Sequence, residues 1–356
     1  MPKSDKDFTY HHSAELTWFK GKFYLAWTVT PKNEHTLPYQ GWVSTSSDGE
    51  TWSEPINIAA PGDAAYLEYM RKRFNIPGDE EVVVNSAPRN WHIHDGKLYL
   101  WSLGWTSRLN GRDWVGRVLW TENGAEWQEI SAAELDRLEK EEGLVIRETG
   151  SNRGFARIRG DRLLAATNGP TRADGLKLCA PITSDLTGLS DWEGGWIDTH
   201  LADNIGEPNC WEGRDGALHF LVRSTGVHVW HSYSLDSGKT WSRLQAQPGF
   251  TDNPSNKNFG RLADGTIWYV GNPIPLGKRV PLVLGLSRDG WKFDRSFLVR
   301  PEPIEQLWPD LKKTERPGYE YPTALYHDGI LYVAYSHARD FIEVTKINVD
   351  DIPPEE

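Results

Sequence analysis

The stretch that decides the fold is SSDGETW at residues 46–52. Variations on it recur as WTENGAEW at 120–127, SLDSGKTW at 234–241 and SRDGWKF at 287–293. In each copy an acidic side chain should accept backbone N–H bonds within a tight turn, a glycine supplies backbone freedom, and an aromatic ring packs back between sheets. The acidic residues are Asp48, Glu122, Asp236 and Asp289. A turn that recurs in this way indicates a repeated β-unit and has a structural role.

A second pattern occurs six times: a polar cluster, an alternating strand, a tight turn and another strand. The copies begin at His11, Asn90, Asn152, Asn209, Asn258 and Glu320. Hairpin signals such as DGK, RDGA, ADGT and HDG lie between the alternating runs. The spacing of roughly 50 to 80 residues suits one four-stranded antiparallel sheet per copy. The sequence therefore predicts an all-β fold, a six-bladed β-propeller in which residues 1–356 form a single domain.

Two segments depart from the β pattern. Residues 63–74 and 131–143 are predicted to be short helical insertions, the second opening with Ser131 and Glu134 at the spacing of a capping box. The sixth repeat has no SSDGETW-like turn. We therefore expect the N-terminal residues to supply the last strand of that blade and close the ring.

Composition argues against several classes of protein. The chain has 39 Lys and Arg against 50 Asp and Glu, a net charge of −11, and no Lys/Arg-rich run, which disfavours nucleic acid as a partner. Two cysteines, Cys179 and Cys210, cannot form a disulfide framework or a thiolate metal site. No apolar run of about 18 residues is present, so we expect a soluble chain without a membrane partner. We expect no cofactor and leave compartment and oligomeric state open.

Residues just before the innermost strands should meet at one end of the propeller axis, because these strands run side by side around it. The expected layer contains His11, His12, Asn90, Trp91, His92, Asn152, Arg153, Glu207, Asn209, Asn258, Glu320 and Tyr321. A structural repeat needs no polar layer, so the sequence predicts a ligand site on the axis. The 18 tryptophans and 13 tyrosines add rings on which a sugar could stack.

The four recurring turns at 46–52, 120–127, 234–241 and 287–293 are called the aspartate-centred turns below. Together with the segment EPNCWEGRDGALHFLVR at 207–223, they resemble the sialidase superfamily. The resemblance extends over all six repeats. It implies that Glu207 is the general base, that Tyr321 is the nucleophile, and that Arg223 and Arg279 hold a substrate carboxylate. The chemistry is coherent, because a phenol of pKa near 10 needs a carboxylate partner to act as a nucleophile, and arginines bind carboxylates bidentately. The implied activity is exo-acting hydrolysis of a terminal carboxylated sugar in an acidic glycan or oligosaccharide.

The first repeat departs from that family. Residues 11–14 read HHSA, where sialidases have an arginine followed by Ile-Pro. This makes His12 a further catalytic candidate. Trp91, His92, Arg153 and Asn209 complete the expected substrate-binding set.

Two alternatives remain open. Propeller polysaccharide lyases and rhamnose–glucuronate enzymes have axial His, Arg and Tyr residues, and His12, His92, Arg153 and Tyr321 could supply the cation, base and acid of an elimination. The other alternative is a carbohydrate-binding propeller without catalysis. His92 and His94 share a strand face and with His12 could offer three nitrogen ligands, but we expect no metal site.

Overall fold

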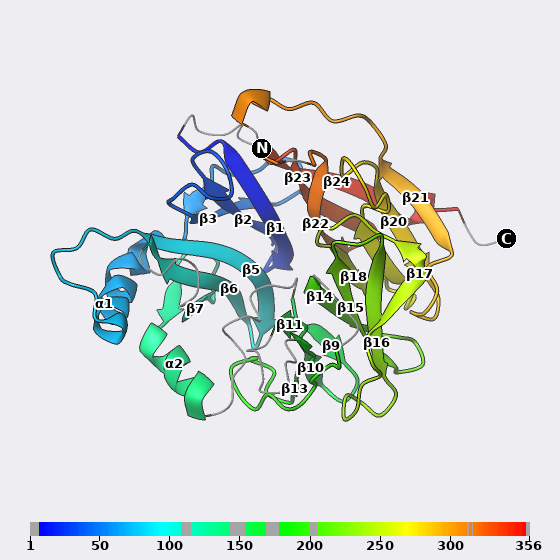
Figure 1. The fold of residues 1–356 in the computed structure, drawn as a ribbon, viewed down its shortest axis with the longest axis horizontal. Helices are drawn as coiled ribbons and strands as arrows, with labels where there is room; N and C mark the ends of the chain where they lie inside the picture. The colour runs from blue at the N-terminus through cyan, green and yellow to red at the C-terminus, as the bar shows by residue number, and fades with distance from the viewer. Residues whose placement is uncertain are drawn as a thin grey trace.

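The computed structural model describes residues 7–107, 115–141, 154–168, 178–199, 205–311, 313–314 and 316–353. Their strands form six antiparallel sheets of three or four strands around a central axis (Figure 1). The chain therefore has the predicted six-bladed β-propeller fold. In each four-stranded blade the strands are hydrogen-bonded in chain order, and β1, β5, β14, β18 and β22 lie nearest the axis.

The strand bounds are as follows. The first blade contains β1 (Tyr10–Phe19), β2 (Lys22–Thr30), β3 (Gln40–Ser46) and β4 (Ile56–Asn57), and the second contains β5 (Val84–His94), β6 (Lys97–Thr106), β7 (Val115–Thr121) and β8 (Gln128–Ile130). The third contains β9 (Ala156–Ile158), β10 (Arg162–Leu164) and β13 (Ile182–Thr183), with a separate ladder of β11 (Thr167–Asn168) and β12 (Leu178–Cys179). The fourth contains β14 (Ile205–Glu212), β15 (Leu218–Ser224), β16 (His228–Ser234) and β17 (Gln245–Thr251). The fifth contains β18 (Asn258–Arg261), β19 (Ile267–Gly271), β20 (Leu282–Ser287) and β21 (Arg295–Arg300), and the sixth contains β22 (Tyr319–His327), β23 (Ile330–His337) and β24 (Phe341–Asn348).

The recurrent turns bind their own backbone as expected, with one correction. Asp48 Oδ1 accepts the N–H groups of Glu50 and Thr51, both at 2.8 Å. Asp289 Oδ1 accepts two N–H groups in the same way, and Asp236 Oδ1 accepts one, from Thr240. In the second blade, however, Asn123 Oδ1 accepts the two N–H groups, each at 2.9 Å. The expectation for Glu122 is therefore wrong, because the side chain of the next residue, Asn123, is the one that reaches the backbone N–H groups of the turn.

The ring closes differently from the expectation. The sixth sheet has three strands, and residues 7–9, the first that the structure describes, do not join it. Instead Thr9 N–H donates to Pro31 O at 3.1 Å, and the chain enters the first blade as β1. The first and sixth blades meet where His11 N–H donates to Arg339 O at 2.9 Å. For the described residues, closure by an N-terminal strand of the sixth blade is thus wrong.

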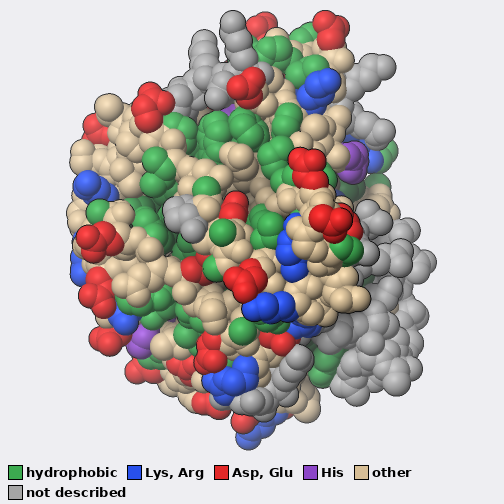
Figure 2. Space-filling model, turned by 90° about the vertical axis from the view of Figure 1, so that its left-hand side faces the viewer, with side chains coloured by type: hydrophobic (Ala, Val, Ile, Leu, Met, Phe, Trp, Pro, Cys, Tyr) green, Lys and Arg blue, Asp and Glu red, His purple; other side chains and the backbone are tan. Residues whose placement is uncertain are grey.

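Two helices, α1 (Asp63–Phe74) and α2 (Ala132–Glu141), lie on the outside of the second blade (Figure 1). Ser131 Oγ caps α2 by accepting Glu134 N–H at 3.2 Å. No helix in the described ranges is long and apolar enough to cross a membrane. On the face shown in Figure 2, acidic and basic side chains are interspersed rather than gathered in one patch.

Candidate active site

Bulges interrupt four of the inner strands at the same end of the axis. The ladder register shifts between His12 and Glu15, Pro88 and Asn90, Gly206 and Pro208, and Glu320 and Thr323. Three residues within these bulges have φ in the left-handed region, namely Ser13 (55°), Glu207 (51°) and Tyr321 (51°). Non-glycine residues rarely adopt this conformation, and such strain is concentrated at functional sites. The bulges therefore mark this end of the axis as the candidate site.

Tyr321 and Glu207 form the centre of the site. The Tyr321 hydroxyl donates to Glu207 Oε1 at 2.6 Å. Arg223, near the end of β15, holds the same carboxylate with Nε 2.7 Å from Oε2 and Nη2 3.0 Å from Oε1. Burial and the Glu207 charge raise the pKa of Tyr321, and the guanidinium groups of Arg223 and Arg279 oppose this only in part. The resting phenol is therefore protonated and serves as a hydrogen-bond donor.

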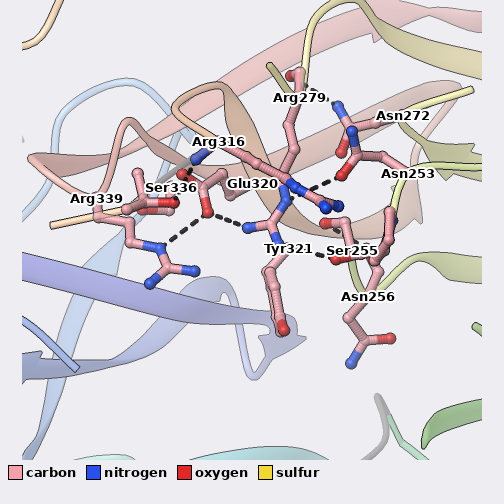
Figure 3. Close-up of polar contacts among 12 residues, drawn as sticks. Asn253, Ser255, Asn256, Asn272, Arg279, Arg316, Glu320, Tyr321, Ser336 and Arg339 are labelled. Carbon is pink, nitrogen blue, oxygen red and sulfur yellow. Dashed lines mark hydrogen bonds and ion pairs between the residues drawn. The ribbon is translucent and has the colours of Figure 1, made fainter. Parts of the chain in front are cut away.

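A second arginine lies against the Tyr321 ring (Figure 3). The guanidinium carbon of Arg279 is 5.5 Å from the ring centroid, within the range of a cation–π contact. Its Nη1 forms an ion pair with Glu320, and its Nη2 donates to Pro254 O at 2.8 Å. Glu320 is fully buried. Arg279 is thus fixed by a buried carboxylate while its guanidinium group lies against the tyrosine ring.

A third arginine, Arg339, shares that carboxylate and was not predicted from the sequence. It lies in the connection between β23 and β24, and its Nε donates to Glu320 Oε2 at 2.9 Å (Figure 3). Its Nη1 lies 3.0 Å from Tyr10 Oη and 2.9 Å from Glu34 Oε2. Burial alone lowers the pKa of Arg339, but the carboxylates around it raise the pKa well above its usual range. Arg339 therefore remains charged beside the axis.

A buried polar segment, residues 252–258, accepts hydrogen bonds from two of the arginines. Arg223 Nη1 and Arg279 Nη2 both donate to Pro254 O, at 3.0 and 2.8 Å. Asn209 Nδ2 donates to Asn256 Oδ1 at 3.1 Å. Asn209 is therefore buried and in contact with this segment.

One buried ion pair within the segment explains why so polar a stretch is inside the protein. Lys257 Nζ lies 2.6 Å from Asp252 Oδ2, and both side chains are almost completely buried. Burial raises the pKa of Asp252 to about 6, although the Lys257 charge opposes it. Sequence reasoning missed this segment, apart from Asn258, because a run of polar residues usually indicates an exposed loop.

The remaining predicted site residues fall into three groups. His12, on β1, joins the site: its ring centroid is 4.1 Å from that of Tyr321. Trp91 and His92 instead pack between blades, because Trp91 Nε1 donates to Glu15 O at 3.0 Å and His92 Nε2 lies 2.6 Å from Leu186 O. Arg153 lies outside the described residues.

The structure places a different residue of the second blade at the bulge. Arg89, which the sequence analysis did not single out, lies between the shifted pairs of β5, and its Nη1 is 3.5 Å from Ser13 Oγ. His92 and His94 follow further along the strand, near the turn at residues 95–96. Among the described residues, no group of three or more His, Cys, Asp or Glu side chains is arranged to hold a metal ion.

Comparisons with solved structures agree with the fold. The chain is similar to a protein of unknown function from Dyadobacter fermentans (17% identity, 96% of this chain and 94% of that chain, TM-score 0.64). It is also similar to the intramolecular trans-sialidase from Ruminococcus gnavus (11%, 99% and 97%, 0.64) and to the NanB sialidase from Streptococcus pneumoniae (14%, 99% and 70%, 0.61). At these identities the likeness concerns the fold alone.

Comparisons of sequence complete the assignment. No curated protein gave a significant match. The sequence profile described as "BNR repeat-like domain" matches residues 42–333, which is most of the chain and includes all the aspartate-centred turns. The chain therefore belongs to the BNR repeat-like domain family, with the six-bladed propeller fold that the sialidases share.

Proposed function

We propose that this protein is an exo-acting glycoside hydrolase for a terminal carboxylated sugar, with Tyr321 as nucleophile and Glu207 as its base. The observation that carries the proposal is the 2.6 Å hydrogen bond from Tyr321 Oη to Glu207 Oε1. The two residues are 114 positions apart in the sequence, and each projects from a strained bulge of a different blade. A merely structural pair would not require strain in both strands.

The chemistry follows from the positions of these groups. Tyr321 Oη attacks the anomeric carbon, and the new C–O bond forms as the glycosidic C–O bond breaks. The phenolic proton passes to Glu207 Oε1, and the electron pair of the broken bond leaves with the aglycone oxygen, which takes up a proton from solvent water. A water molecule then displaces the tyrosine from the sugar and releases one proton to solvent, and the proton on Glu207 returns to the phenolate oxygen.

The charge of the site supports a carboxylated substrate. Arg223, Arg279 and Arg339 carry three positive charges against the two negative charges of Glu207 and Glu320. A third negative charge comes from Glu34, in the loop between β2 and β3. Its side chain is 52% exposed and forms an ion pair with Arg339. A sugar carboxylate is the same chemical group, so it could replace Glu34 at Arg339 without leaving a buried charge unpaired.

Tyr321→Phe tests the proposal. Turnover of 4-methylumbelliferyl glycosides of N-acetylneuraminic acid and glucuronic acid should be measured for the wild type and the variant, with reducing-end analysis of acidic oligosaccharides in parallel. We expect loss of turnover with little change in melting temperature, because only the hydroxyl is removed. Tyr326→Phe, on the same strand but near its other end, is the matched control and should retain activity.

Two outcomes would contradict the proposal. A Tyr321→Phe variant that still turned over the substrate of the wild type would exclude the tyrosine as nucleophile. Cleavage accompanied by a rise in near-ultraviolet absorbance would reveal an unsaturated uronate. That result would favour elimination, with His12 and Tyr321 as the acid and base beside the substrate.

A further inference from the structure

We propose a second ligand site, for a neutral pyranose ring, between the outer strands of the fourth and fifth blades. A cavity of about 430 Å³ lies there, within the roughly 300 to 1,000 Å³ typical of small-molecule sites. β16 and β17 of one blade and β20 and β21 of the next border it, on the right of Figure 1. This site is separate from the Tyr321–Glu207 pair and does not depend on the function proposed above.

An irregularity in β17 opens the cavity. Trp230 pairs with Ala246 and His228 pairs with Thr251, so one residue of β16 faces residues 247–250 of β17. This extra length is left out of the ladder, and three of its residues, Gln247, Gly249 and Phe250, line the cavity. Bulges of this kind are found where a strand must present side chains in a particular direction.

Trp291, on the opposite rim, is unexpected in its turn. It follows the glycine of the fourth aspartate-centred turn, and the same position holds Glu50, Ala125 and Lys239 in the other three. The turn itself therefore needs no ring there. Trp291 is nevertheless 41% exposed, whereas the ring two residues later, Phe293, fulfils the packing role of the turn.

The exposed ring is held in one orientation. Trp291 Nε1 donates to Asp215 Oδ2 at 3.0 Å, and the ring makes edge contacts with His219 and Tyr233 at centroid distances of 4.4 and 5.0 Å. A ring that is fixed before binding loses little conformational freedom when a ligand stacks on it. Rigid, partly exposed aromatic side chains are therefore suited to binding.

The chemistry of the lining favours a neutral ligand with an apolar face and a hydroxylated edge. Aromatic rings, including Trp211, Phe250 and Trp291, form much of the wall, while Gln247 and Ser296 add hydrogen-bonding groups. No carboxylate lines the cavity. The one charged residue in its lining is Lys292, whose Nζ forms an ion pair with Asp294 Oδ2 at 3.5 Å. The C–H face of a pyranose can stack on the exposed ring of Trp291, while its hydroxyl groups bond to Gln247 and Ser296. Trp211 is not a stacking surface, because Phe259 and His219 already stack on its ring.

The test uses the full chain and two probes, methyl β-D-galactopyranoside and lactose. Saturation-transfer NMR with titration should detect binding of at least one probe to the wild type. Trp291→Ala should weaken that affinity roughly tenfold, which corresponds to about 1.4 kcal/mol. This variant should fold, because alanine already occupies the same turn position at Ala125. Gln247→Ala, on the other rim, repeats the test without changing the turn.

Two controls make the result specific. Glu50→Ala changes the equivalent position of the first turn and should leave sugar affinity unchanged. Tyr321→Phe should also leave it unchanged, because that residue lies on the axis. The proposal is overturned if neither probe binds, if both Trp291→Ala and Gln247→Ala bind like the wild type, or if Tyr321→Phe abolishes binding.

Discussion

The replacement Glu320→Gln tests how the arginine cluster is held together. Glu320 is fully buried and accepts hydrogen bonds from both Arg279 and Arg339, whose side chains are only 8% exposed. Glutamine keeps the shape of the side chain but removes the negative charge between the two guanidinium groups. Removal of one partner from a buried ion pair typically costs about 3 to 5 kcal/mol, because the remaining charge is left uncompensated. We expect a loss of that size in the free energy of unfolding.

Urea unfolding followed by tryptophan fluorescence measures this loss as the change in midpoint multiplied by the slope of the transition. Glu302→Gln is the matched control: Glu302 pairs with Arg300 at 3.2 Å, but its side chain is 59% exposed, so its midpoint should stay close to that of the wild type. If Glu320→Gln and Glu302→Gln shifted the midpoint equally, burial of the carboxylate would not be what stabilises the cluster.

Two further predictions concern stability. Burial lowers the pKa of His219 to about 3 and that of His231 to about 4, below their ordinary value of about 6.5, so the unfolded chain binds protons more readily than the folded one. Their contribution to stability is present above pH 6.5 and is lost as the pH falls, by about 2 kcal/mol per histidine at pH 5. His231→Gln should therefore show a smaller decrease in unfolding free energy between pH 7.5 and pH 5 than the wild type, and an equal decrease would refute the assignment. Asn123→Ala should lower the free energy of unfolding by about 1 to 2 kcal/mol, because it removes two hydrogen bonds to backbone N–H groups, whereas Glu122→Ala should lower it little. Thermal melting of both variants checks this. A larger loss of stability in Glu122→Ala than in Asn123→Ala would contradict the geometry of the turn.

The fold could be predicted because its determinants are local. Each aspartate-centred turn and each hairpin is formed by fewer than about ten consecutive residues, so its sequence is sufficient to identify it. Where the prediction of a turn failed, the local rule admitted two solutions. Glu122 and Asn123 are adjacent and both carry suitable oxygens, and only the path of the backbone decides between them.

The site was predictable in part for the same reason. Glu207 and Tyr321 were placed in the axial layer because they open inner strands, whereas Arg223, near the end of the strand that pairs with one of them, was singled out by the resemblance to the sialidases. Arg339 was missed because it lies between β23 and β24, where no repeat motif marks it. A topological signal was nevertheless available: the connection after the second strand of a blade returns to the end of the axis at which the first strand began. Glu320 was placed in the layer, but its shared pairing depends on two arginines that approach from different blades.

The protonation state of Tyr321 bears on how the proposed reaction would begin. A neutral phenol is a weak nucleophile, and in the resting site burial and the Glu207 charge keep it neutral. Positive charge develops on the sugar ring as the glycosidic bond breaks, and it does so beside the Tyr321 oxygen. That charge favours the phenolate at the moment when Glu207 can accept the proton along an existing 2.6 Å hydrogen bond.

This coupling requires that the two side chains meet, which the bulges in β14 and β22 make possible. In a regular strand, a shift of one residue moves a side chain to the opposite face of the sheet. Glu207 and Tyr321 both lie at such shifts, so a change that restored a regular ladder in either strand would turn one partner away from the axis. The strained backbone is therefore the feature that connects the repeated fold to the proposed chemistry.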